Sequence, residues 1–100
     1  MKIVKLPRAL ADLIETAEYY AQDDPHVADS FFDAFEKSIE ILRKSPKLGS
    51  LRLTENYGEV RMWFVPGFEK CLIFYTESSS ELMILRIIHA SRDYQRVIDE

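Results

Sequence analysis

The chain has 100 residues, of which 47% are hydrophobic and 12% aromatic, a composition that suits one small folded domain and excludes a disordered segment. Its net charge of −4 is evenly spread, with seven Lys/Arg against nine Asp/Glu in residues 1–50 and six against eight in residues 51–100. Because non-specific nucleic-acid binding depends on Lys and Arg neutralising phosphates, this balance argues against direct nucleic-acid binding and favours a protein partner.

Cysteine and histidine are too sparse for several kinds of site. The single cysteine, Cys71, excludes an intrachain disulfide and a Cys-based metal cluster, which suits a reducing cytoplasm. His26 and His89 lie far apart in sequence, so we expect no metal site, and isolated glycines predict no phosphate-binding loop or cofactor. With no signal-like segment and no apolar run of about 18 residues, we expect a cytoplasmic protein without a membrane span.

The first half predicts a short strand and two helices. Residues 2–6 alternate polar and apolar side chains, and Pro7 ends this strand and begins a helix that extends to Gln22. Apolar residues recur there at helical spacing at Leu10, Leu13, Ile14, Ala17 and Ala21. The opposite, solvent side is expected to hold Asp12, Glu15, Glu18 and Gln22.

A second helix is predicted from Pro25 to Lys44, with Asp24 as its N-cap. Its apolar stripe comprises Ala28, Phe31, Phe32, Phe35, Ile39 and Leu42. The short break between the helices predicts an antiparallel hairpin. We expect the face of this hairpin that packs on the sheet to be filled by Phe31, Phe32, Phe35, Leu10 and Leu13.

The second half changes to the two-residue period of strands. Strands are predicted near residues 51–53, 60–65, 71–76 and 82–88, with turns at 66–67 and 78–80 and a short helix in 93–100. The whole chain, 1–100, is thus predicted to be one α+β domain in which the helix hairpin packs on one face of an antiparallel sheet of three to four strands. We expect Trp63 and Val65 to lie on its other face, open to a partner.

Two arginines lie within apolar strands. Arg61 is predicted to share a face with Trp63 and Val65, and Arg86 to share one with Leu82, Ile84 and Ile88. A buried arginine is costly without a partner, so each should either pair with a carboxylate or line an open concave surface.

One polar cluster follows the last strand, at His89, Ser91, Arg92, Asp93 and Tyr94. His89 is either a general base or a side chain that ends the strand and fixes the following loop. Ser78–Ser80 and Cys71 lack the surroundings of an activated nucleophile and are interpreted as turn and core.

The order of elements, together with the segments DLIETAEYYA, SPKLGS, LIFY and LRIIHASRDY, resembles the RelE/ParE superfamily of bacterial toxins. The resemblance is greatest to its ParE (plasmid stabilisation) branch. It implies the toxin component of a type II toxin-antitoxin module, which binds and poisons DNA gyrase. It also implies a hetero-oligomer with a cognate ParD-like antitoxin, whose C-terminal segment wraps around the toxin.

The ribonuclease branch of the same superfamily is similar in order but has arginines where this chain has Cys71 and Ala90. The resemblance therefore carries over no catalytic residue, and a ribosome-dependent mRNA endonuclease and an inactive regulatory module stay open as alternatives. Residues suggested for partner contact are Arg61, Trp63, Arg86, His89, Arg92, Asp93 and Tyr94.

Overall fold

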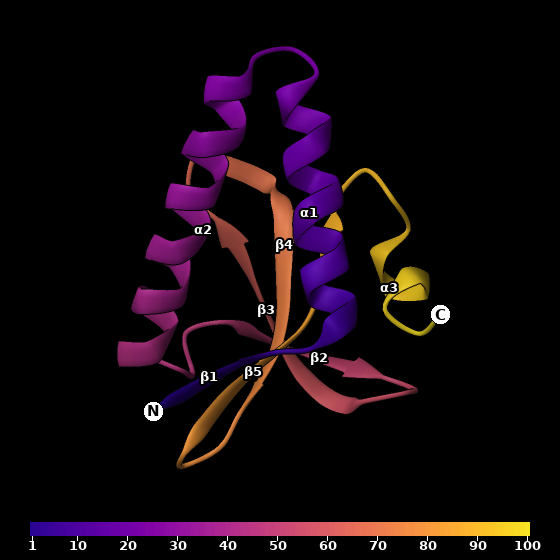
Figure 1. Ribbon diagram of the computed structural model, residues 1–100. Coiled ribbons are helices and arrows are strands. Elements are labelled where there is room, and N and C mark those ends of the chain that lie inside the picture. The colour runs from indigo at the N-terminus through magenta and orange to yellow at the C-terminus, as the bar shows by residue number, and fades with distance from the viewer.

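The computed structural model describes all residues from 1 to 100. Its elements are β1 (Lys2–Lys5), α1 (Pro7–Ala21), α2 (Pro25–Lys44), β2 (Ser50–Thr54), β3 (Gly58–Val65), β4 (Phe68–Glu77), β5 (Glu81–His89) and α3 (Tyr94–Val97). The strands form one sheet in the order β1-β5-β4-β3-β2, and the α1–α2 hairpin covers one face of it (Figure 1). The predicted α+β architecture is confirmed.

The helix boundaries follow from local chemistry. Pro25 occupies the first turn of α2, and the Asp24 carboxylate accepts a hydrogen bond from the His26 amide at 2.9 Å, so the predicted N-cap is confirmed. Helix α1 begins at Pro7, where the missing amide hydrogen costs nothing, and ends at Ala21, one residue before the predicted end. Residues 22–24 alone join the two helices, which forces them antiparallel.

The main core lies between the hairpin and the sheet. Phe31 and Phe35 are fully buried there, as predicted, but Leu10 and Phe32 remain 43% and 38% exposed, so their assignment to the packed face was wrong. The packed stripe of α1 is instead Ala9, Asp12, Leu13 and Ala17. Two small residues, Ala9 and Ala17, belong to this buried stripe, and Leu10 lies on the exposed side of the helix.

The sheet is mixed. Strands β2 to β5 pair antiparallel in sequence order, as predicted. Strand β1 adds to the far edge in parallel with β5, with Lys2 opposite Glu81 and Lys5 opposite Ile84, which the sequence did not reveal. This fifth strand covers only the first half of β5, and the rest of that edge faces α1.

Irregularities in pairing change which side chains share a face. Tyr75 pairs with Ile84 and Phe74 with Arg86, so Leu85 is an extra residue on β5. Beyond this bulge Ile87, not Ile88, joins Leu82 and Ile84 in the main core. The predicted face of Arg86, Leu82, Ile84 and Ile88 was therefore wrong.

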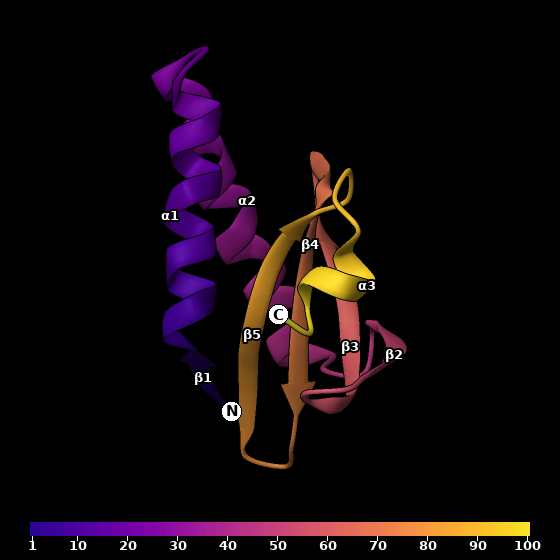
Figure 2. The ribbon, with the colours of Figure 1, turned by 90° about the vertical axis from the view of Figure 1, so that its right-hand side faces the viewer.

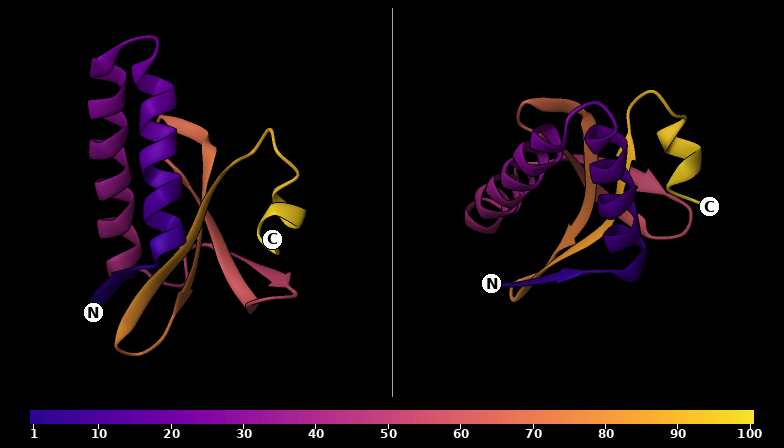
Figure 3. Two further views of the ribbon diagram at one scale, coloured as in Figure 1. Left: turned by 45° about the vertical axis from the view of Figure 1, so that its right-hand side comes forward. Right: turned by 45° about the horizontal axis from the view of Figure 1, so that its top comes forward.

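The second face of the sheet is covered by the C-terminal segment. Figures 2 and 3 show the chain leaving β5, arching away and returning so that α3 lies on the side of the sheet opposite the hairpin. A second buried cluster forms there from Val60, Leu72, Phe74, Leu85, Ile88, Val97 and Ile98. Trp63 and Val65 pack with the main core instead, so the expectation that they lie on an open second face was wrong.

Candidate functional site at the end of the last strand

A buried ion pair holds the end of β5 in place. The Arg86 Nε and Nη2 atoms donate to the two carboxylate oxygens of Asp12 at 2.7 and 3.3 Å, and both side chains are almost fully buried. The same carboxylate accepts the Ile87 amide at 3.0 Å, where β1 no longer covers the strand edge. Arg86 Nη1 donates to the Val97 carbonyl at 3.1 Å. The pair thus joins α1, β5 and the C-terminal segment.

The prediction that Asp12 lies on the solvent side of α1 was wrong. The Asp12 side chain is 7% exposed and lies at the strand edge. An arginine inside an apolar strand signals a buried carboxylate, and that signal was present in the sequence. The partner's identity depends on the rotation of α1 against the sheet, which the spacing of its apolar residues left ambiguous.

Arg61 also has a structural role. Its Nη1 donates to the Lys47 and Gly49 carbonyls at 3.0 and 2.8 Å, and its Nε lies 3.5 Å from a Glu77 carboxylate oxygen. The buried Tyr75 hydroxyl supports the same loop, accepting from the Gly49 amide and donating to the Pro46 carbonyl. Burial raises the pKa of Tyr75, so this hydroxyl keeps its proton at neutral pH.

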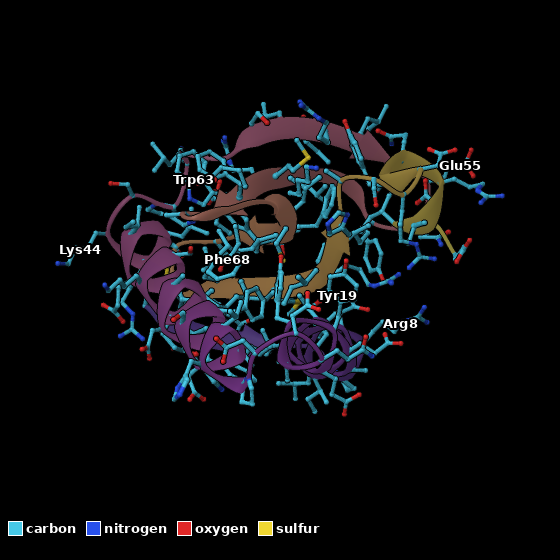
Figure 4. The ribbon with its side chains drawn as sticks, turned by 90° about the horizontal axis from the view of Figure 1, so that it is seen from above. Arg8, Tyr19, Lys44, Glu55, Trp63 and Phe68 are labelled. Carbon is cyan, nitrogen blue, oxygen red and sulfur yellow. The ribbon has the colours of Figure 1, made fainter.

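The remaining residues suggested for partner contact do not form one surface. Trp63 stacks on Phe64 with ring centroids 4.8 Å apart, and its Nε1 atom is buried without a hydrogen-bond partner. Figure 4 shows Trp63 and Glu55 at opposite ends of the view, with Glu55 beside α3. Only His89, Arg92, Asp93 and Tyr94 lie together, in the exit segment, residues 89–94.

Within the exit segment, Asp93 and Tyr94 anchor the chain. The Asp93 carboxylate accepts from the Arg96 amide at 3.4 Å as the N-cap of α3. The Tyr94 ring lies 6.0 Å from that of Phe74 and packs against the second buried cluster. Both side chains therefore hold the C-terminal segment on the sheet.

A pocket of about 320 Å³ opens between α1 and the exit segment. Its lining comprises Asp12, Glu15, Thr16, Tyr19, Ile87, Ile88, His89, Ser91 and Arg92. In the view down the hairpin in Figure 4, Tyr19 lies between α1 and β5. The pocket combines an apolar wall with an exposed acid, Glu15, and an exposed base, Arg92. The sequence pattern indicated the exit-segment half of this lining but not the half that α1 supplies.

The two ring nitrogens of His89 differ in their surroundings. Nδ1 accepts the Ser91 amide at 3.1 Å and lies 2.6 Å from the Ser91 hydroxyl oxygen. An amide can only donate, so Nδ1 is the acceptor in this bond, and the tautomer that fits it carries the ring hydrogen on Nε2. This geometry fits the interpretation of His89 as the residue that ends the strand and fixes the loop.

Cys71 and Ala90, the positions of the two missing arginines, bring no charge. Burial raises the pKa of the Cys71 thiol to about 12, with a smaller contribution from the Asp12 carboxylate, so the thiol stays neutral. Cys71 faces the main core, and the Ala90 amide donates to the Lys70 carbonyl. No group of three or more His, Cys, Asp or Glu side chains is placed to hold a metal ion. None of the helices combines the length and apolar character needed to cross a membrane.

Residues 3–94 match the family described as the ParE toxin of the type II toxin-antitoxin system, parDE. The chain belongs to the ParE toxin family. This confirms the resemblance inferred from the order of elements and from the LRIIHASRDY segment. A comparison with curated proteins gives no significant match.

Proposed function

We propose that this ParE-family chain is a cytoplasmic toxin that binds and poisons DNA gyrase, and that a cognate ParD-like antitoxin holds it inactive in a hetero-oligomer. The observation that carries the proposal is the family match over residues 3–94, which includes α1, α2, strands β2 to β5 and all but the first residue of β1. The evenly acidic charge supports action on a protein rather than on nucleic acid.

The side chains at Cys71 in β4 and at Ala90 after β5 argue against the endonuclease alternative. A metal-free ribonuclease needs cationic groups around the scissile phosphate, and losing one such contact typically costs about 2.7–4 kcal/mol of transition-state stabilisation. The buried, neutral Cys71 and the methyl group of Ala90 supply neither of the two charges expected at these positions. We therefore expect no ribosome-dependent cleavage of mRNA.

Exposed apolar side chains support binding of an antitoxin. Leu10 and Ile14, four residues apart and so on the same side of α1, are 43% and 55% exposed. On the edge strand β2, Leu51 and Leu53 are 51% and 77% exposed. A disordered antitoxin segment that folds on binding would cover such separate apolar sites, by helix contact on α1 and by strand pairing at β2.

The antitoxin part of the proposal is tested by co-expression with the product of the neighbouring reading frame, followed by pull-down. Leu53→Lys and Ile14→Lys should each weaken the complex, whereas Glu18→Lys, an exposed site on the same helix that removes no apolar contact, should change it less. Failure of wild-type protein to form any complex would refute this part.

The toxin part is tested by induced expression, with a supercoiling and cleavage assay on purified gyrase beside primer extension on mRNA. We expect gyrase-linked DNA breaks, and uncut mRNA. Codon-positioned mRNA cuts with unaffected gyrase would favour the endonuclease, and silence in both assays would favour the inactive module.

A further inference from the structure

We propose that the pocket between α1 and the exit segment binds the carboxylate of an Asp or Glu side chain of a partner protein, with Arg92 and His89 as donors. The inference deepens the proposed function and rests on it only for the partner's identity. The pocket volume of about 320 Å³ lies at the small end of the range of ligand sites, which suits one or two side chains of a docked segment.

Arg92 is the first donor. The chain's ion pairs involve Lys5, Arg43, Arg61, Arg86 and Arg96. Arg92 is in none of them, although Glu15 lines the same pocket and Asp93 is its neighbour. The Asp93 carboxylate is engaged by the amide and the guanidinium of Arg96. An unpaired guanidinium at a pocket offers two parallel donors to a carboxylate.

His89 is the second donor. Because the Ser91 amide fixes Nδ1 as an acceptor, the neutral ring presents Nε2–H, and this atom has no hydrogen-bond partner within the chain. The Asp12 carboxylate, which also lines the pocket, repels an anion only weakly. Asp12 is neutralised by two bonds from Arg86 and a third from the Ile87 amide. Ile87, Ile88 and the Tyr19 ring supply apolar contact for the methylene stem of the incoming side chain.

The charge of Glu15 affects which kind of anion the pocket can bind. Its exposed carboxylate lies on the pocket lining and repels any negative ligand, and the repulsion grows with the ligand's charge. A carboxylate carries one negative charge, whereas a phosphate group carries up to two at neutral pH. Only one full positive charge, that of Arg92, is free to offset them. The charge balance therefore favours a protein carboxylate over a phosphate.

The test is a ¹⁵N NMR titration of the full chain with N-acetyl-glutamate N-methylamide, against its neutral glutamine analogue at constant ionic strength. We expect saturable shifts of the Ser91 and Arg92 amides with glutamate and none with glutamine. Arg92→Gln should weaken binding roughly tenfold, the loss of a charge-assisted hydrogen bond. Arg8→Gln, an exposed arginine of α1 outside the pocket lining, is the matched control and should change nothing.

Glu15→Gln supplies a sign test. It should tighten glutamate binding about two- to threefold, as expected for removal of one exposed like charge. The inference would be overturned by equal chemical shift changes with the glutamate and glutamine analogues, or by weaker glutamate binding to Glu15→Gln than to wild type. It would also be overturned if inorganic phosphate bound more tightly than the glutamate analogue, or if Arg92→Gln and Arg8→Gln lost equal affinity. The titration needs neither gyrase nor antitoxin, so it tests the pocket independently of the proposed function. The gyrase assay and the antitoxin pull-down with wild-type protein test the proposed function itself.

Discussion

Removal of Arg86 should destabilise the protein far more than removal of any surface arginine. Arg86→Met leaves the Asp12 carboxylate buried with only the Ile87 amide as a donor, and removes one of the two donors to the Val97 carbonyl, which keeps the Glu100 amide. Breaking a buried pair by removing one member costs about 3–5 kcal/mol. For a domain of this size that lowers the melting temperature by at least about 12 °C.

The double mutant tests whether the cost is electrostatic. Asp12→Leu should also cost about 3–5 kcal/mol, because it leaves the Arg86 charge unpaired. With both charges removed, only the Ile87 amide is left without a partner, because the Val97 carbonyl still accepts from the Glu100 amide, so the double mutant should cost about 1–3 kcal/mol. The two single costs exceed the double cost by a coupling free energy of at least about 3 kcal/mol.

Urea unfolding followed by far-UV circular dichroism measures all these values. Arg96→Gln is the matched control, because its ion pair with Asp93 is 4.0 Å long with side chains 75% and 65% exposed. It should stay within about 0.5 kcal/mol of wild type. A cost below about 1 kcal/mol for Arg86→Met, or additive single costs, would refute the reasoning. The expected loss also means that reduced toxicity of Arg86→Ala would report folding, not contact with a target.

Three further outcomes follow from local contacts and can be measured by urea unfolding. A Cβ atom at Gly49 would lie 2.6 Å from the Tyr75 hydroxyl, so Gly49→Ala should cost about 1–3 kcal/mol. Its cost should shrink in a Tyr75→Phe background. Asp24→Ala should cost about 1 kcal/mol by removing the N-cap of α2, whereas Asp23→Ala should be near neutral. Because burial raises the pKa of Cys71 from 9.0 to about 12, only the unfolded thiol ionises between these values. The stability of the native state should therefore be intact below pH 9 and fall as pH rises towards 12, by up to about 1.4 kcal/mol per pH unit. Cys71→Ala should lack this part of the loss, and equal pH profiles for the two proteins would contradict the assignment.

Local signals in the sequence were sufficient for most of the fold. The change from helical to strand periodicity near Ser50, the proline and aspartate at the start of α2, and the turn at Pro66–Gly67 each act over a few residues. They predicted both helices and the antiparallel strands β2 to β5. No local sequence pattern predicts the pairing of β1 with β5, because the paired residues are about 80 positions apart along the chain.

The site was less predictable because it depends on small shifts in register. One extra residue, Leu85, moves Ile87 into the main core and directs Arg86 towards the Val97 carbonyl. Leucine has no conformational preference that would mark position 85 as the site of a bulge. Likewise, Ala9 and not Leu10 lies on the packed side of α1, although Leu10 is the larger apolar side chain. The bulge and the packed side of α1 together place Asp12 and Tyr19 beside the exit segment. Neither could be inferred from the spacing of apolar residues alone.

The parallel pairing of β1 with β5 also bears on the order in which the protein folds during synthesis. Chains are made from the N-terminus, so β1 and α1 leave the ribosome long before the strand and the arginine that complete their contacts. Until Arg86 and Ile87 arrive, the Asp12 carboxylate has no buried partner and α1 lacks β5, the strand whose edge it contacts. We therefore expect the nascent chain to expose apolar surface until synthesis is nearly complete, and to be sensitive to chaperones during that interval.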